Sequence, residues 1–206
     1  MPYLATNIAE FWHRWHISLS SWLRDYLFIP LGGSRGGTWQ TCRNLMITMT
    51  LGGLWHGASW TFVAWGGLHG LLLVVHRGVR ALCKARPALD AVLRTAPGVL
   101  LRGGLTFLCV CIGWVFFRAT TFGTAAAMLR RMFVFETGRG SALHSMGMWY
   151  TVLFVVVCHV VAATGAWKRV SLRVPAPVLG CAYSLALTLA LLLAPPTSKA
   201  FIYFQF

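Results

Sequence analysis

Two stretches of sequence decide the fold: FWHRWHISLSSWLRDYLFIPLGG at residues 11–33 and LGGLWHGASWTFVAWGGLHG at residues 51–70. Both place histidines among tryptophan, leucine and glycine, in a chain that is 57% hydrophobic. An ionisable side chain at membrane depth is costly and usually faces a bundle interior or a watery cavity, so it marks a candidate functional site. His56, inside the second stretch, is therefore the first residue that needs an explanation.

The composition is that of a membrane protein rather than an ordinary soluble domain. Only 11% of the 206 residues are charged, and Asp, Glu, Lys and Arg are absent from residues 44–76, 103–117, 140–167 and 174–198. A helix needs roughly 20 apolar residues to cross a bilayer. We predict an all-α, polytopic membrane bundle with four to five spans. The predicted segments are a histidine-bearing one at 44–76, either one tilted helix or a broken pair, and further spans at 98–117, 148–167 and 176–194.

The formal charge of +14 does not make nucleic acid a partner in such a chain. The 18 Lys and Arg residues lie mostly between the apolar runs, where loop cations meet lipid headgroups. The six cysteines are scattered and lack the paired spacing of a zinc site or the density of a disulfide framework. We therefore expect the lipid bilayer as a partner, no nucleic acid, and cysteines that act as small core residues.

Residues 11–27 are predicted to form one amphipathic helix that lies in the membrane interface. At 100° per residue, the apolar side consists of Phe11, Trp12, Trp15, Leu19, Trp22, Leu23 and Tyr26. His16 falls at the border of that side, from which its ring can reach toward the apolar interior. Pro30 and the glycine-rich run at 31–37 end the helix in a turn. A phosphate-binding loop is the alternative, but the run matches neither common glycine motif.

The histidine-bearing segment carries small residues at helical spacing. Gly53 and Gly57 form one G-x-x-x-G pair, and Gly66 and Gly70 form a second. Such spacing lets helix backbones approach closely within a bilayer, so we expect His56 to pack beside another element.

Burial would keep His56 neutral, which is the form that accepts a proton from a substrate hydroxyl as a general base. The alternative is that His56 has a structural role only, as a histidine that is hydrogen-bonded between helices. His16 alone is an interfacial histidine, and the fold decides whether it meets His56. His69 lies 13 residues beyond His56, roughly 20 Å along a continuous helix, and is expected to serve helix packing.

Two further candidate sites are less favoured by the sequence. His13 and His16 have a spacing that can hold a metal, but no second pair of ligands follows, so no metal site is expected. Asp25 could orient a histidine, but an ion pair with Arg14 or Arg24 is the preferred interpretation. No Cys accompanies a His in an electropositive, accessible setting, and no nucleophile-elbow motif is present.

At the motif residues the chain resembles the membrane-bound O-acyltransferase family, in its bacterial branch that acetylates alginate. Three pieces carry the resemblance: residues 11–33, LGGLWHGASW at residues 51–60, and FIYFQF at residues 201–206. The match is dense from residue 11 to residue 70 and looser beyond. Residues 1–206 look like the C-terminal half of such a protein. His13 stands where relatives usually have Arg, which is expected to alter only a surface contact.

The resemblance implies transfer of an acyl group, usually acetyl, to hydroxyls of an exopolysaccharide or cell-envelope polymer. It implies that His56 is the central catalytic histidine and that His16 is the second one, which positions a reactant. The implied donor is acetyl-CoA or another activated acyl carrier, with no bound cofactor. The implied location is the inner membrane, as a multi-pass protein working with periplasmic acetyltransferase partners.

A second functional hypothesis is kept beside the enzyme. The chain would then be a non-catalytic truncated membrane protein, or a scaffold subunit of an envelope-modification complex. Such a protein would tolerate the loss of His56 and need only its helices.

Overall fold

The computed structural model describes residues 1–134 and 145–192, and its regular elements in these ranges are all helical. Residues 1–137 and 138–206 form two units, which are described separately. The predicted all-α class is thus confirmed for the described residues. The FIYFQF motif at 201–206 lies outside them.

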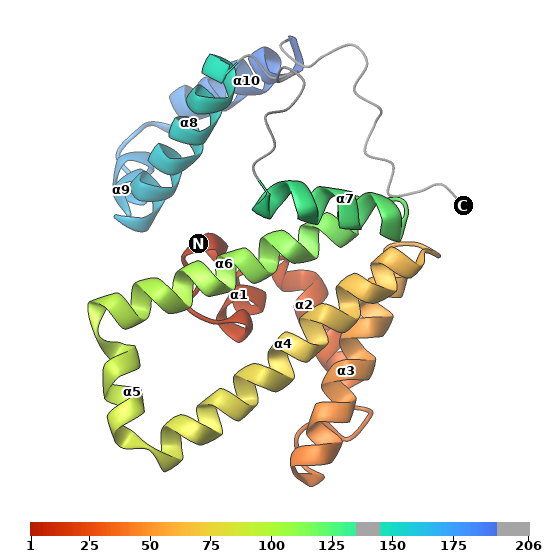
Figure 1. Ribbon diagram of the computed structural model, residues 1–206. Coiled ribbons are helices and arrows are strands. Elements are labelled where there is room, and N and C mark those ends of the chain that lie inside the picture. The colour runs from red at the N-terminus through yellow and green to blue at the C-terminus, as the bar shows by residue number, and fades with distance from the viewer. Residues whose placement is uncertain (135–144, 193–206) are drawn as a thin grey trace. The chain divides into compact units, whose positions relative to one another are not determined.

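The N-terminal unit is built around three long helices, α3, α4 and α6, with shorter segments packed against them (Figure 1). Its elements are η1 (Pro2–Leu4), α1 (Ile8–Arg14), α2 (Ile17–Leu23), η2 (Arg24–Phe28), α3 (Gly37–Trp55), α4 (Trp60–Ala85), α5 (Pro87–Arg94), α6 (Ala96–Arg118) and α7 (Phe122–Phe133). In Figure 1, α3 and α4 form a V that opens from the turn between them. The short α5 joins the far end of α4 to α6, which runs back and converges on α4 near the end that meets α3.

The predicted single helix at 11–27 is wrong, because the chain breaks at His16. α1 ends at Arg14, Trp15 is extended, and His16 begins α2 in a left-handed conformation with φ of 43°. The break is held by side chains, since the Leu19 N–H donates to His16 Nδ1 and Ser20 Oγ donates to the Trp15 carbonyl. The expected apolar side is buried at Phe11, Trp12, Leu19 and Leu23, while Trp22 and Tyr26 are exposed.

The predicted turn at 31–37 is confirmed, and a buried asparagine holds it. Gly32, Gly33 and Gly37 all have positive φ, which glycine adopts at little cost. Asn44 of α3 is fully buried, and its Nδ2 donates to the carbonyls of Leu31 and Gly33 at 3.0 Å each. The turn carbonyls are thereby fixed against α3.

The histidine-bearing segment is the broken pair rather than one tilted helix. α3 ends at Trp55 and α4 begins at Trp60. The predicted close approach is confirmed: a Cβ built on Gly53 would lie 2.2 Å from the Phe62 carbonyl oxygen, and one on Gly66 would lie 2.3 Å from the Met49 carbonyl oxygen. Only residues without a side chain fit at these positions.

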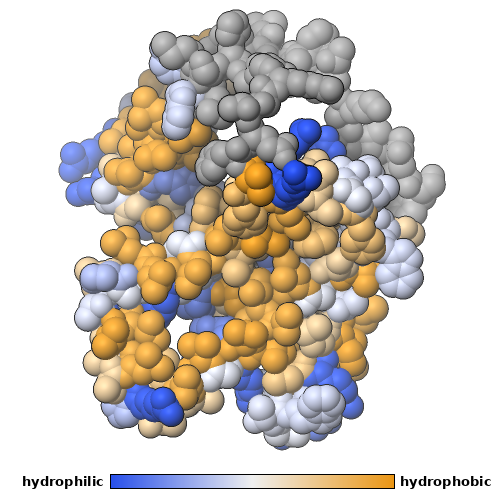
Figure 2. Space-filling model, in the orientation of Figure 1, coloured by the Kyte–Doolittle hydropathy of each residue, from blue (hydrophilic) through white to orange (hydrophobic). Residues whose placement is uncertain are grey.

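α4 and α6 are the two helices among the described residues that are long and apolar enough to cross a membrane. Their most apolar 18-residue windows are only 22% and 11% buried within the protein, whereas the core helix of a soluble domain is mostly buried. Figure 2 shows the apolar surface that α4 and α6 present. α6 covers the predicted span at 98–117.

The C-terminal unit contains α8 (Ser145–Ala163), α9 (Ala166–Ser171) and α10 (Ala176–Leu192). The predicted span at 148–167 is interrupted at Gly165, which has a φ of 66° and separates α8 from α9. α10 covers the span predicted at 176–194 as far as the described residues extend. The described apolar parts of α8 and α10 run over Val152–Ala163 and Ala176–Thr188, and the total of four to five spans stays a prediction.

Replacing Gly53 by alanine is expected to destabilise the N-terminal unit. The new methyl group would meet a backbone oxygen that cannot move without separating α3 from α4, and overpacking of this kind costs roughly 1–3 kcal/mol. Gly78→Ala on α4 is the matched control, since nothing lies within 4 Å of its added Cβ. Thermal unfolding in detergent should show a lower Tm for Gly53→Ala and an equal or higher Tm for Gly78→Ala. Equal effects of the two substitutions would contradict the close helix contact.

Candidate active site

His56 lies in the turn between α3 and α4 and is the C-cap residue of α3. Its N–H donates to the Gly53 carbonyl at 3.1 Å. Gly57 follows with a φ of 151°, and a Cβ there would lie 2.9 Å from the Phe62 ring. Ser59 then caps α4 by accepting a hydrogen bond from the Thr61 N–H. The sequence HGAS thus stops one helix, turns the chain tightly and starts the next.

Aromatic rings enclose the His56 imidazole on several sides. The ring centroids of Trp55, Trp65 and Phe117 lie 4.9, 5.3 and 5.0 Å from that of His56, each in an edge-on arrangement. The side chain is half-buried and lies outside both candidate spans. Burial lowers the pKa of His56 below its ordinary value of 6.5, and the charge of His16 lowers that pKa further. At neutral pH His56 is therefore uncharged and able to accept a proton.

The fold brings His16 within electrostatic reach of His56, which the sequence left open. The His16 ring is exposed, and its Nδ1 accepts the Leu19 N–H at 3.4 Å, with Ser18 Oγ 3.5 Å away. An imidazole whose Nδ1 accepts carries its proton on Nε2 when it is neutral. His16 is therefore oriented as a hydrogen-bond donor, while His56 is suited to be the acceptor.

His69 joins the same aromatic cluster, and its predicted separation from His56 is corrected. The distance estimate assumed a continuous helix, but the turn at residues 56–59 folds His56 back along α4. Trp65 then contacts both rings, with centroids 5.3 Å from His56 and 4.9 Å from His69. His69 is only 1% exposed, and neither ring nitrogen has a hydrogen-bond partner within the described residues. The expected packing role fits its burial.

One glycine of α6 makes room for His69. A Cβ on Gly113 would lie 2.7 Å from His69 Nε2, so a larger residue would force α6 away from α4. Phe117, one turn further along α6, reaches the His56 ring. Neither residue was predicted from the sequence, although a lone glycine in the apolar run CIGWVFF is the signal of a close helix approach.

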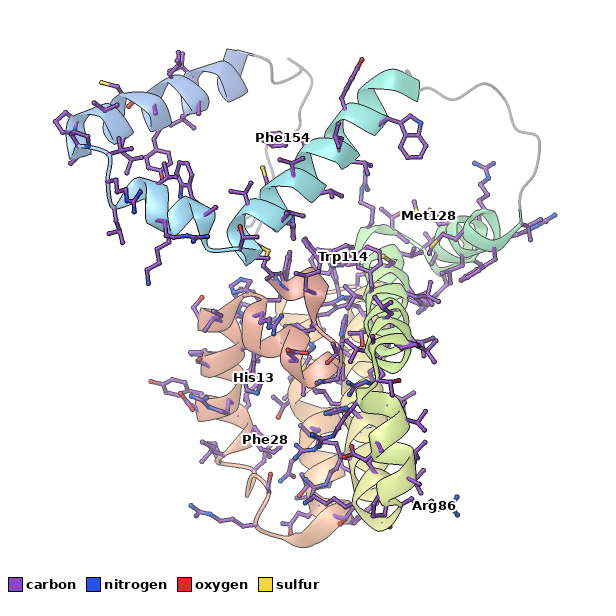
Figure 3. All side chains as sticks on the ribbon, turned by 90° about the vertical axis from the view of Figure 1, so that its left-hand side faces the viewer. His13, Phe28, Arg86, Trp114, Met128 and Phe154 are labelled. Atoms are coloured by element: carbon purple, nitrogen blue, oxygen red, sulfur yellow. The ribbon has the colours of Figure 1, made fainter. Side chains whose placement is uncertain are left out.

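A pocket of about 300 Å³ lies beside this cluster, between α1, α2 and α3. Trp12 lines this pocket, and its ring centroid lies 5.8 Å from that of Trp65. Trp12 therefore links the pocket to the ring that contacts His56. Ser20, Ser21 and Thr48 add hydroxyl groups to an otherwise apolar wall. His13, labelled in Figure 3, is also part of the lining, but His16 and His56 are not.

Asp25 forms the predicted ion pair with Arg24, at 2.8 Å between Oδ1 and Nε. The hydrogen bond from Arg24 lowers the pKa of the exposed Asp25 carboxyl. Arg14 instead pairs with Glu10, whose carboxylate also accepts hydrogen bonds from Thr6. Asp25 thus has a structural partner of its own.

Several known proteins are similar in sequence to this chain. Residues 2–100 match the sequence model of the membrane-bound O-acyltransferase family. Probable alginate O-acetylase AlgI of Azotobacter vinelandii is 52% identical over 134 residues, which are 65% of this chain and 25% of that protein. A peptidoglycan O-acetyltransferase of Helicobacter pylori is 43% identical over 132 residues, 64% of this chain and 24% of that protein.

A teichoic acid D-alanyltransferase of Streptococcus thermophilus is 37% identical over 82 residues, 36% of this chain and 20% of that protein. The matched part of the chain spans about a quarter of the length of the relatives, or less. The two O-acetyl-transferring relatives match about two thirds of this chain. Residues 2–100 of this chain are therefore assigned to the membrane-bound O-acyltransferase family.

Proposed function

We propose that this chain carries the proton-transfer centre of an acyltransferase that esterifies hydroxyls of an exopolysaccharide or cell-envelope polymer, with acetyl as the acyl group. The half-buried His56, enclosed by aromatic rings and electrostatically coupled to His16, is the observation that carries the proposal. The names of relatives that act on alginate and peptidoglycan support the choice of acceptor.

In the proposed reaction, His56 takes the proton of an acceptor hydroxyl as a general base. The hydroxyl oxygen attacks the carbonyl carbon of the donor, and the bond from that carbon to the donor's leaving group breaks. The departing group then receives the proton from His56, which returns to its neutral form. An ester forms, and the atoms and charges balance without any further reactant.

His16 is the positioning residue in this proposal. With Nδ1 occupied by the Leu19 N–H, its Nε2–H is free to donate to an oxygen of the donor or acceptor. A donor aimed at an oxygen that gains negative charge in the transition state lowers the barrier. The two histidines thus take complementary parts, one accepting and one donating.

The proposed cellular setting is the one predicted from the sequence. The donor would be acetyl-CoA or another activated acyl carrier, and the protein would be a multi-pass protein of the inner membrane. Periplasmic acetyltransferase proteins would be its partners. The apolar, largely unburied surfaces of α4 and α6 support the membrane part of this proposal.

A scaffold function is the second candidate, and one observation favours it. The His56 ring packs against Trp65 of α4 and Phe117 of α6, and this contact joins the helices whether or not His56 takes part in chemistry. A protein that only holds other subunits together would need α3, α4 and α6 in place and would be indifferent to the chemistry of His56.

Replacing His56 by glutamine at the native locus is expected to abolish ester-linked acetyl on the envelope polysaccharides. Glutamine keeps the polar side chain but cannot accept the proton, so we expect a loss of at least about a hundredfold. The readout is acetate released by mild base from purified polysaccharide, at equal membrane levels of the protein. His159→Gln, which changes a half-buried histidine of α8, is the matched control.

Deleting the whole gene separates the two functions. Acetyl lost in both the deletion strain and the His56→Gln strain supports catalysis by this chain. Acetyl lost only in the deletion strain would establish the scaffold function instead. Unchanged acetyl in both strains would contradict each of them.

Two substitutions at His16 distinguish its role as the N-cap of α2 from its proposed role in positioning a reactant. Asparagine tolerates a positive φ and caps helices well, so His16→Asn should keep the stability of the wild type. Alanine lacks the cap and should cost about 1 kcal/mol of folding free energy. Both variants should lose acetyl transfer, by about tenfold to a thousandfold, if the ring positions a reactant. A fully active His16→Asn variant would reduce His16 to a structural cap.

The titration of His56 can be followed without any activity. Diethyl pyrocarbonate modifies neutral imidazole, so the extent of modification at His56, read by mass spectrometry across pH, gives its pKa in membranes. We expect a midpoint below 6.5, because burial and the His16 charge both disfavour the imidazolium. His16→Asn removes that charge and should move the midpoint to higher pH. An unchanged midpoint in His16→Asn would show that His16 has no electrostatic effect on the pKa of His56.

A further inference from the structure

A second pocket, of about 490 Å³, lies between α4, α5 and α6. Figure 2 shows an opening framed by these helices, and Figure 3 shows Arg86 at the junction of α4 and α5, at the opposite end of α6 from Trp114. Arg102 in the pocket wall precedes Phe117 by 15 residues on α6, or about 22 Å along a continuous helix. The pocket is therefore separate from the ring cluster around His56.

Cations from three helices line this pocket. Arg80 and Lys84 come from α4, Arg94 from α5 and Arg102 from α6. Asp90 is the single acidic residue in the lining, and its carboxylate already binds Arg94 at 2.7 Å. The other three cations form no salt bridge within the described residues. Positive charge is thus gathered here without an equal number of carboxylates.

The cations converge on one region rather than pointing away from each other. His76, Arg80 and Lys84 are four residues apart in turn and share one face of α4. Arg102 of α6 lines the same pocket as these three residues, so side chains of α4 and α6 face the same place. A bound anion would offset the repulsion that this arrangement creates.

Arg102 is the residue that ordinary loop charge does not explain. Lys84 lies in the last turn of α4, where a cation favours the helix dipole, but Arg102 lies inside an apolar helix long enough to cross a membrane. Its Nε is buried and has no hydrogen-bond partner within the described residues. Glu10 senses its charge, yet that carboxylate is already bound by Arg14 and Thr6. An arginine in such a place marks a site.

The rest of the lining is apolar and continues onto the outer surface. Leu101, Leu105 and Val75 line the pocket and are 59%, 53% and 53% exposed. A ligand that fits must therefore combine an anionic group with hydrocarbon. Basic pockets between membrane helices bind anionic lipid headgroups in this way.

We propose that this pocket binds the phosphate group of an anionic phospholipid. The guanidinium groups of Arg80 and Arg102 and the ammonium of Lys84 contact the phosphate oxygens, which match arginine geometry well. The acyl chains lie against Leu101 and Leu105. The proposal is independent of the acyl transfer proposed above, because it concerns a pocket at the other end of α6.

The test uses the full chain purified in detergent and titrated with phosphatidylglycerol, with bound lipid counted by native mass spectrometry. Arg80→Gln/Lys84→Gln removes two exposed pocket cations, and Arg86→Gln/Arg118→Gln removes two exposed cations that do not line the pocket. The pocket pair should weaken binding by at least about tenfold, and the control pair by less than about twofold. Phosphatidylcholine, with no net charge, should bind more weakly than phosphatidylglycerol.

The effect of Arg102→Gln is measured as the change in Tm on lipid addition, because a substitution within α6 can also alter the stability of the protein itself. Phosphatidylglycerol should raise the Tm of the wild type and raise that of Arg102→Gln far less, because a ligand stabilises only the state that binds it. Equal weakening by the two charge pairs would overturn the proposal in favour of unspecific surface charge. Inorganic pyrophosphate that binds the wild type and displaces the lipid would overturn the lipid source and identify a soluble phosphate compound instead.

Discussion

The close approach of α3 and α4 is the contact on which the rest of the N-terminal unit depends. Helices in lipid gain little from burying apolar surface against each other, so association relies on van der Waals contact over bare backbone. Gly53 and Gly66 supply that contact because each faces a carbonyl of the other helix with no side chain between them. The turn that carries His56 joins α3 to α4 next to this contact.

The aromatic cluster around Trp65 extends this contact to the other elements. Trp65 touches His56 and His69, Trp12 reaches it from α1, and Phe117 reaches it from α6. Edge-on ring contacts contribute about 0.5–1.5 kcal/mol each beyond their buried area, so the cluster resists small displacements of any one helix. A half-buried imidazole in such a setting is held in one orientation, which a positioned general base requires.

Local patterns allowed part of this to be predicted from the sequence. The helical class, the turn at 31–37 and the glycine contact follow from composition and spacing over a few residues. The break at His16 did not, because a helical wheel assumes a continuous helix and gives no sign that a histidine ring will cap the next one. The pairing of His56 with Trp65 was also missed, although Gly57 and Ser59 are ordinary signals for a helix end and a helix start. The basic pocket depends on how α5 turns the chain, which no local pattern specifies.

The position of His56 at the end of α3 helps to reconcile two demands on a general base. The residue must be neutral before the reaction, and burial among rings ensures this by disfavouring the imidazolium. It must also tolerate a positive charge once it has taken the proton, and the unpaired carbonyls at a helix C-terminus favour a cation by roughly 0.3–1 kcal/mol. Burial wins in the resting state, since the net shift of the His56 pKa is downward. The imidazolium of the proposed reaction thus forms beside helix carbonyls, which offset part of the cost of charging a half-buried ring.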